Sequence, residues 1–175
     1  YVYYGDFSSG IGDGNLDEML LYLAVCNGLI IDVRNNGGGN LTTASQLAAR
    51  FTNEQVLTGY IQHKTGPGHS AFSDPDPVSL DPPDGVRWQK PVVVLTNRHS
   101  YSATNDFVNS MNCLPQVTLL GDKTGGGSGL PFSSELPNGW GVRFSASPML
   151  DAQKQHIEFG IGPDVKLDMT DEDED

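Results

Sequence analysis

The sequence is poor in cysteine, in basic side chains and in long apolar runs, and each shortage excludes a class of protein. Cys26 and Cys113 have no metal-type spacing, and we favour two separate thiols over a disulfide. No apolar run approaches the roughly 20 residues that span a bilayer, so we expect no membrane insertion. Lys and Arg number 10 against 22 Asp and Glu, and the net charge of -12 disfavours nucleic acid as a partner.

The rest of the composition is that of a folded domain. Of the 175 residues, 37% are hydrophobic and 18% are charged, which is enough for one domain with a buried core. We predict this core domain over residues 1–168 and an acidic, disordered tail over residues 169–175. Because the chain starts at Tyr1, apparently inside a strand, we expect the domain to be the C-terminal part of a longer protein.

Predicted strands and helices alternate along the first two thirds of the chain. The apolar runs LIIDV and PVVVLT predict buried strands, at 29–33 and 91–96. Helices are predicted at 15–26, 41–51 and 102–111. This alternation predicts an α/β fold with a mainly parallel sheet and crossover helices. A mixed β part follows, with a last strand at 155–159, and the proline-rich stretch 65–90 predicts a long loop.

Two polar loops follow the two buried strands, and parallel strands bring such loops to one edge of the sheet. One loop holds Gly37, Gly38 and Gly39, whose amides could be aimed at a ligand oxygen. The other places Ser102 at a strand-to-helix junction, where the Ala103 N–H points into the same space. Taken alone, Ser102 is more simply a helix cap. Together with the glycines it indicates a nucleophile beside an oxyanion hole.

A second glycine loop, Gly125–Gly127, is less specific. It lacks the G-K-[ST] ending of a phosphate-binding loop, so we exclude a nucleotide site.

Five motifs in order resemble the C-terminal-processing (tail-specific) serine peptidases, in particular the branch of the tricorn core peptidase and the interphotoreceptor retinoid-binding modules. The motifs are GLIIDVRNNGGGN, VVVLTNRHSYSATNDF, GDKTGGGSG, LPNGW and EFGIGPDV, and they cover roughly residues 1–165. The resemblance implies a ClpP/crotonase-like ββα superhelix. It also implies a serine endopeptidase that hydrolyses peptides or unfolded proteins through an acyl-enzyme, without metal or organic cofactor. Export to the periplasm, cell envelope or extracellular space is implied too, as is a PDZ-like or helical region upstream.

The same resemblance assigns roles to single residues. Ser102 matches the nucleophile, and Ala103 with Gly38 and Gly39 matches the oxyanion hole. Glu158 matches the carboxylate that supports the base in the tricorn-like branch.

The general base departs from both branches of the family. Gly127 stands where one branch has a lysine, and Asn105 where that branch has a glutamate. Tyr3 stands where the tricorn-like branch has a histidine, and a phenol with a pKa near 10 is a weak base. A serine needs a partner to take its proton, so the base must be sought elsewhere.

Two histidines are candidates for this base. His99 lies three residues before Ser102, and His156 lies two residues before Glu158, on the same face if that segment is a strand. Otherwise the base lies upstream of Tyr1, comes from another chain, or is missing.

Two other functions stay open at this point. A non-catalytic relative with the same fold would bind peptides or apolar ligands, and the missing lysine and histidine favour it. A crotonase-type acyl-CoA enzyme would also use backbone amides as an oxyanion hole, but the net charge of -12 disfavours a polyanionic substrate.

Overall fold

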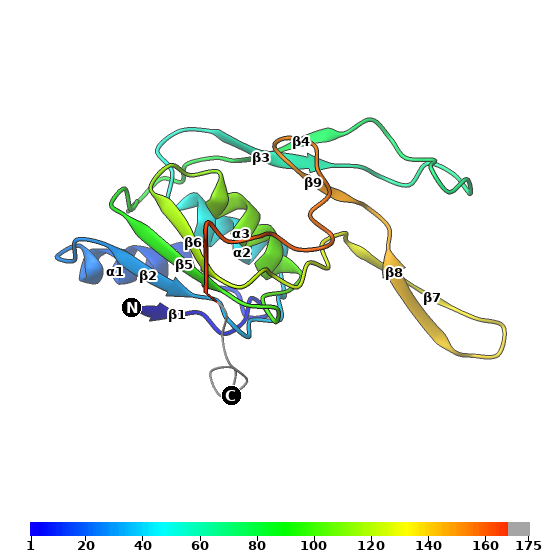
Figure 1. Ribbon diagram of the computed structural model, residues 1–175, viewed down its shortest axis with the longest axis horizontal. Helices are drawn as coiled ribbons and strands as arrows, with labels where there is room; N and C mark the ends of the chain where they lie inside the picture. The colour runs from blue at the N-terminus through cyan, green and yellow to red at the C-terminus, as the bar shows by residue number, and fades with distance from the viewer. Residues whose placement is uncertain (168–175) are drawn as a thin grey trace.

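Five parallel strands form the central sheet of the computed structural model, which describes residues 1–167 (Figure 1). The strand order is β1-β2-β5-β6-β10, and every neighbouring pair is parallel. The strands are β1 (Val2–Tyr3), β2 (Leu29–Asp32), β5 (Val92–Thr96), β6 (Val117–Gly121) and β10 (Val165–Lys166). The predicted parallel sheet is thus confirmed, whereas the acidic tail predicted at 169–175 lies outside the described residues.

Three helices lie in the first three of the four connections between the parallel strands, and the connection from β6 to β10 contains no helix. They are α1 (Asp13–Leu23), α2 (Leu41–Ala49) and α3 (Ala103–Asn112). All three predicted helices are present. Helix α1 begins earlier than predicted, because Gly12 and not Asn15 holds its N-cap position, and it also ends earlier, at Leu23. Asn40 caps α2, since its side chain accepts a hydrogen bond from the Thr42 N–H.

A smaller antiparallel sheet covers α2 and α3 on the side away from the central sheet (Figure 1). Its order is β4-β3-β9, from β3 (Val56–Ile61), β4 (Asp76–Leu80) and β9 (Met149–Asp151). The prediction of one long loop over 65–90 was therefore wrong for its middle part. Pro77 is tolerated in β4 because β4 is an edge strand, where the missing N–H costs no ladder bond.

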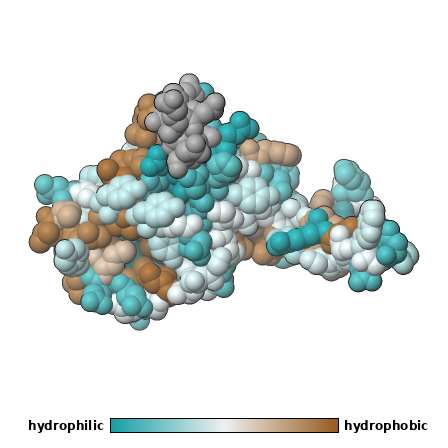
Figure 2. Space-filling view, turned by 90° about the horizontal axis from the view of Figure 1, so that it is seen from below, coloured by the Kyte–Doolittle hydropathy of each residue, from teal (hydrophilic) through white to brown (hydrophobic). Residues whose placement is uncertain are grey.

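A two-stranded hairpin, β7 (Pro131–Glu135) and β8 (Gly141–Ser145), projects from the body (Figures 1 and 2). Every residue of β7 is exposed. The mixed β C-terminal part is confirmed, but the strand predicted at 155–159 is wrong, because this segment forms only one antiparallel bridge, between His156 and Leu150, and then a turn. After the bridge, the carbonyls are held by partners outside a strand ladder: Ile157 O accepts from the Asn105 side chain, and Glu158 O accepts from the Gly127 N–H.

The core fills the space between the central sheet and the helices. Phe7, Val94 and Phe107 are almost fully buried there, and the rings of Phe7 and Phe107 lie 5.5 Å apart. Cys26 and Cys113 are both unpaired. Among residues 1–167, no helix has the length and apolar character needed to cross a bilayer.

Arg50 is buried beside this core, and its charge is compensated by α1. Its guanidinium forms ion pairs with Asp13 and Asp17, which ties the end of α2 to the start of α1.

Candidate active site

Ser102 occupies a strained backbone position between β5 and α3. Its φ of 58° and ψ of -125° are rare for a residue with a side chain, and holding such a residue costs about 1–3 kcal/mol. Neighbouring hydrogen bonds fix the conformation: the Ser102 N–H donates to Gly126 O at 2.7 Å, and Ser102 O accepts from the Asp106 N–H. A sharp strand-to-helix turn of this kind presents a serine hydroxyl above the edge of a sheet.

The glycine turn after β2 packs directly against this serine. Gly38 has a φ of 101°, and a Cβ there would lie 2.8 Å from Ser102 Cβ and 2.9 Å from Ala103 N. Only glycine allows this approach. The two loops that follow the parallel strands are therefore in contact, as their predicted positions require.

The amides around Ser102 divide into engaged and free donors. The Gly38 N–H donates to Asn36 Oδ1 at 2.9 Å, and the Thr104 hydroxyl donates to the same oxygen at 2.7 Å. Asn36 thereby joins the glycine turn to α3. Within residues 1–167, no hydrogen bond uses the N–H of Gly39 or of Ala103. These two amides are unengaged N–H donors of the two loops at Gly38 and Ser102.

Ser102 opens into a groove between the body and the base of the hairpin. The groove has a volume of about 490 Å³. It is lined on the body side by Gly37, Gly39, Tyr101, Ser102 and Gly127, and on the hairpin side by Pro131, Arg143, Phe144 and Ser145.

The serine loop is held from behind by buried polar side chains that sequence reasoning missed. Ser100 is buried, and its hydroxyl donates to Val33 O at 2.8 Å, so it is a structural residue. The Asn97 side chain accepts from the Asn35 N–H and donates to Asn35 Oδ1. Asn36 and Asn97 lie inside the two loop motifs, and this position was the only hint that the sequence offered. The sequence did not indicate which groups they bind.

Glu158 reaches the hairpin wall of the groove. Its carboxylate Oε1 accepts a hydrogen bond from the Ser145 hydroxyl at 3.2 Å, and Ser145 lines the groove. Glu158 is thus linked through Ser145 to the wall of the groove that Ser102 also lines.

Neither candidate histidine lines this groove. His99 is exposed and lines an adjoining hollow, which shares Gly37 and Tyr101 with the groove. His156 lines a cavity at the C-terminal end of α3, with Asn109 and Cys113. Ser102 lies at the other end of this ten-residue helix, about 15 Å long. The predicted placement of His156 and Glu158 on one strand face was wrong, because the pairing with β9 is limited to a bridge at His156 and Glu158 lies in the turn that follows.

Gly127 and Asn105, which the sequence motifs align with the lysine and the glutamate of one branch, are part of the packing. Gly127 lies beneath the ring of Tyr101, at a φ of 76°. Asn105 is buried: its amide donates to Ser128 Oγ at 2.8 Å and to Ile157 O at 3.0 Å, and its Oδ1 accepts from the Thr124 hydroxyl. Asn105 thus connects α3 to the second glycine loop and to the segment before Glu158.

Asp106 is an ionisable group near Ser102 that the sequence did not single out. The Ser128 hydroxyl donates to its Oδ2 at 3.0 Å, whereas its Oδ1 is buried without a hydrogen-bond partner. Burial, together with the nearby charge of Glu158, raises the pKa of Asp106 to about 7.

A strained serine at the start of a helix, with a glycine turn against it and two free amides beside one groove, is an arrangement typical of serine-type hydrolases. The comparison with family models agrees with this class and makes it specific. Residues 1–167 match the model of peptidase family S41, so the chain belongs to that family.

Known proteins show the same relationship. The chain is 27% identical over 139 residues to a carboxyl-terminal-processing protease of Synechocystis, covering 79% of this chain and 30% of that protein. It is 30% identical over 101 residues to the tricorn protease of Thermoplasma volcanium, covering 58% of this chain and 8% of that protein. The crystal structure of a candidate peptidase from Parabacteroides merdae superposes with a TM-score of 0.93 and 63% identity, covering 98% of this chain and 54% of that one. The chain thus spans about a third of the Synechocystis relative and about half of the crystallised one.

Proposed function

We propose that the protein is an endopeptidase of the C-terminal-processing type and that Ser102 is its nucleophile. The observation that carries this proposal is the strained backbone of Ser102, packed against Gly38 at the head of an open groove. Strain of this order persists only where the surroundings enforce it, and it gathers at functional sites.

In the proposed reaction, the Ser102 hydroxyl oxygen attacks the carbonyl carbon of the scissile peptide bond. The carbonyl oxygen becomes an oxyanion, which accepts hydrogen bonds from the Gly39 and Ala103 amides. Gly38 contributes because the lack of a side chain lets the turn pack against Ser102. Asn36 contributes because it accepts a hydrogen bond from the Gly38 N–H and so fixes the turn. The helix N-terminus adds favourable electrostatics. Collapse of the tetrahedral intermediate expels the amine and leaves an acyl-enzyme, which water hydrolyses.

The base in this proposal enters the groove between Ser102 and Glu158, and Glu158 holds it. Of the side chains in residues 1–167 that line the groove, Arg143 and Tyr101 are the titratable ones other than serines. Neither suits proton abstraction near neutral pH. We therefore place the base outside residues 1–167, in an upstream part of the protein or in another chain.

The same proposal includes peptides or unfolded proteins as substrates, an upstream PDZ-like or helical region, and export to the periplasm, cell envelope or extracellular space. These parts rest on the family likeness. Fractionation of cells that produce the full-length protein tests export directly.

A fluorophosphonate probe, which reacts with activated serines, tests the nucleophile. We expect it to label the full-length protein and not the Ser102→Ala variant. Ser134→Ala, at an exposed serine of β7, is the matched control and should label like the wild type. Absence of labelling in the full-length wild type would favour the alternative, a binding module that lacks catalysis.

A further inference from the structure

The second glycine loop, Gly125–Gly127, has no part in the proposed reaction, yet its backbone joins the nucleophile to Glu158. On one side the Ser102 N–H donates to Gly126 O at 2.7 Å. On the other side the Gly127 N–H donates to Glu158 O at 3.0 Å. The position of Glu158 relative to Ser102 therefore depends on how this loop is held.

The side chain of Asn105 holds both ends of the loop. Its Oδ1 accepts from the Thr124 hydroxyl at 2.6 Å, and its Nδ2 donates to Ser128 Oγ at 2.8 Å. Thr124 directly precedes the three glycines, and Ser128 directly follows them. Because glycines carry no side chain, these two neighbours supply the side-chain anchors of the loop.

The same side chain also holds the segment that carries Glu158. Asn105 Nδ2 donates to Ile157 O at 3.0 Å, one residue before Glu158. The Thr124 hydroxyl that binds Asn105 also accepts from the Ile161 N–H at 2.7 Å, three residues after Glu158. Glu158 is therefore fixed on its two sides by Asn105 and by a direct partner of Asn105.

Asn105 is fully buried in α3 and does not line the groove. Both N–H groups of its amide are engaged, and so is its oxygen. It therefore has no contact with a substrate and acts on the site only through the segments that it holds. A buried polar network that is satisfied in this way makes its surroundings rigid.

We propose that Asn105 is a positioning residue that sets the place of Glu158 relative to Ser102, with the second glycine loop as the link between them. This inference rests on the proposed function, in which Glu158 holds the base. Asn105 lies in the first turn of α3, three residues after Ser102 at the N-cap position, so one helix carries both the nucleophile and the anchor of Glu158. A displacement of about 1 Å at a catalytic site is enough to slow a reaction by about 100-fold.

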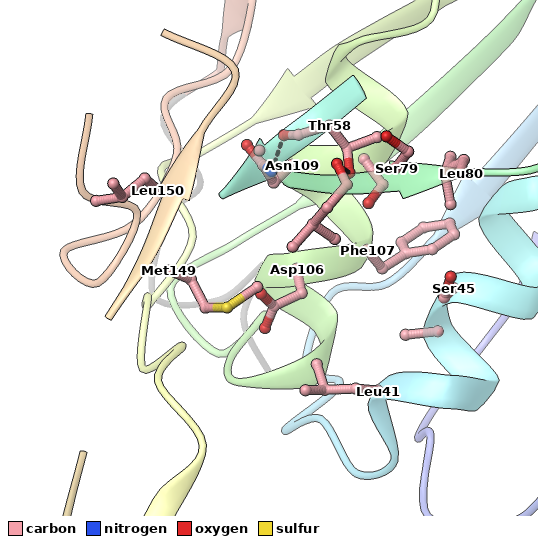
Figure 3. A pocket seen from close by; sticks show the side chains of 14 residues that line it. Leu41, Ser45, Thr58, Ser79, Leu80, Asp106, Phe107, Asn109, Met149 and Leu150 are labelled. Atoms are coloured by element: carbon pink, nitrogen blue, oxygen red, sulfur yellow. Dashed lines mark hydrogen bonds between the residues drawn. The ribbon is translucent and has the colours of Figure 1, made fainter. Parts of the chain in front are cut away.

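Fluorophosphonate labelling of the full-length protein tests this role, with Asn105→Ala compared against Asn109→Ala. Asn109 is a matched control, because it lies one turn further along α3 and is only 8% exposed. Its amide donates to Thr58 O at 2.8 Å, in a cavity between α2, α3 and the small antiparallel sheet (Figure 3). We expect both variants to lower Tm, but only Asn105→Ala to slow labelling, by about 10-fold or more. Equal labelling rates in the two variants would overturn the proposal.

A double-substitution cycle with Glu158→Gln separates positioning from a general loss of packing. Since Asn105 acts through Glu158, Asn105→Ala should slow labelling much less in the Glu158→Gln background than in the wild type. If the two effects multiply instead, Asn105 does not act through Glu158 and the proposal is wrong.

Thr124 provides a second pair of variants, which decides the question if Asn105→Ala does not fold. Thr124→Ser keeps the hydroxyl that Asn105 and Ile161 use, and it should label like the wild type. Thr124→Val keeps the shape without the hydroxyl, and it should slow labelling by about 10-fold. The same labelling rate in both Thr124 variants would contradict the proposal.

Failure of the proposed function has a different signature, namely no labelling of the full-length wild type or unchanged labelling in Glu158→Gln. In that case hydrogen exchange in residues 157–161, followed by mass spectrometry, decides about the positioning. Asn105→Ala should speed exchange of the Ile161 amide by about 10-fold, because Asn105 holds the Thr124 hydroxyl that this amide binds. Asn109→Ala should not. Equal exchange in the two variants would refute the positioning role.

Discussion

The ring of Tyr101 covers Gly127, and a Cβ on Gly127 would overlap the ring atoms Cε2 and Cζ. The sequence motifs align Gly127 with the lysine of one branch of the family. In this chain the space that a side chain at 127 would need is occupied by Tyr101, one residue before Ser102. The packing of Tyr101 therefore leaves no room for a lysine at this position.

Gly127→Ala tests this packing. We expect it to destabilise the protein by more than the 1–3 kcal/mol that positive φ alone costs, because the methyl group must also displace Tyr101. Gly139→Ala is the matched control: it has a φ of 85°, but the space around it is open. Urea unfolding of both variants measures the difference. Equal losses of stability in Gly127→Ala and Gly139→Ala would show that Tyr101 moves aside without destabilising the protein.

Because Tyr101 occupies the space beside residue 127, we expect that Gly127→Lys does not create a working Ser–Lys pair. We expect a lowered Tm and no gain in fluorophosphonate labelling of Ser102. A faster labelling rate than that of the wild type would contradict this expectation.

Gly38→Ala tests the contact between the glycine turn and the nucleophile. The added methyl group would press on Ser102 Cβ and Ala103 N, and so displace the free amides. We expect kcat/KM to fall by about 100-fold or more, the usual effect of losing an oxyanion donor. Gly37→Ala serves as the control, since a Cβ there meets nothing within 4 Å. Similar activity in the two variants would argue against this oxyanion hole.

Asp106 should make stability depend on pH. Its pKa is about 7 in the folded protein, against 3.8 as its ordinary value. Between these values the folded state holds a proton that the unfolded chain has lost, so the free energy of unfolding falls as pH rises from about 4 to about 7. The full difference amounts to about 4 kcal/mol.

Urea unfolding at a series of pH values measures this slope. Asp106→Asn should flatten it, and Glu158→Gln should reduce it, because the Glu158 charge contributes to the raised pKa of Asp106. Asp84→Asn, at an exposed position, should leave it unchanged. Identical slopes in wild type and Asp106→Asn would contradict the raised pKa.

The placement of the base outside residues 1–167 predicts how the histidine variants behave. His99→Ala and His156→Ala should both keep the fluorophosphonate labelling rate of the full-length protein close to the wild type, because neither side chain lines the groove. Glu158→Gln should slow labelling. Loss of labelling in His99→Ala, with an unchanged Tm, would identify His99 as the base instead.

The sequence by itself determined the parallel sheet, the three helices and the position of Ser102. These features depend on local signals: apolar runs, helical spacing and glycines directly after strands. Parallel strands also brought the two loops to one edge, so the contact between Gly38 and Ser102 could be foreseen.

Only the tertiary structure decided which side chains surround the nucleophile. The segment at 155–159 has the composition of a strand, yet it pairs with β9 only at His156, and Asn105 and Gly127 hold the carbonyls of Ile157 and Glu158 in a turn. His156 lines a different cavity from Ser102. In the sequence, Asp106 looks like an ordinary acidic residue of a helix. Its unpaired oxygen and raised pKa depend on burial by residues about 20 to 60 positions away along the chain. Such properties arise from packing between distant segments, which local patterns do not encode.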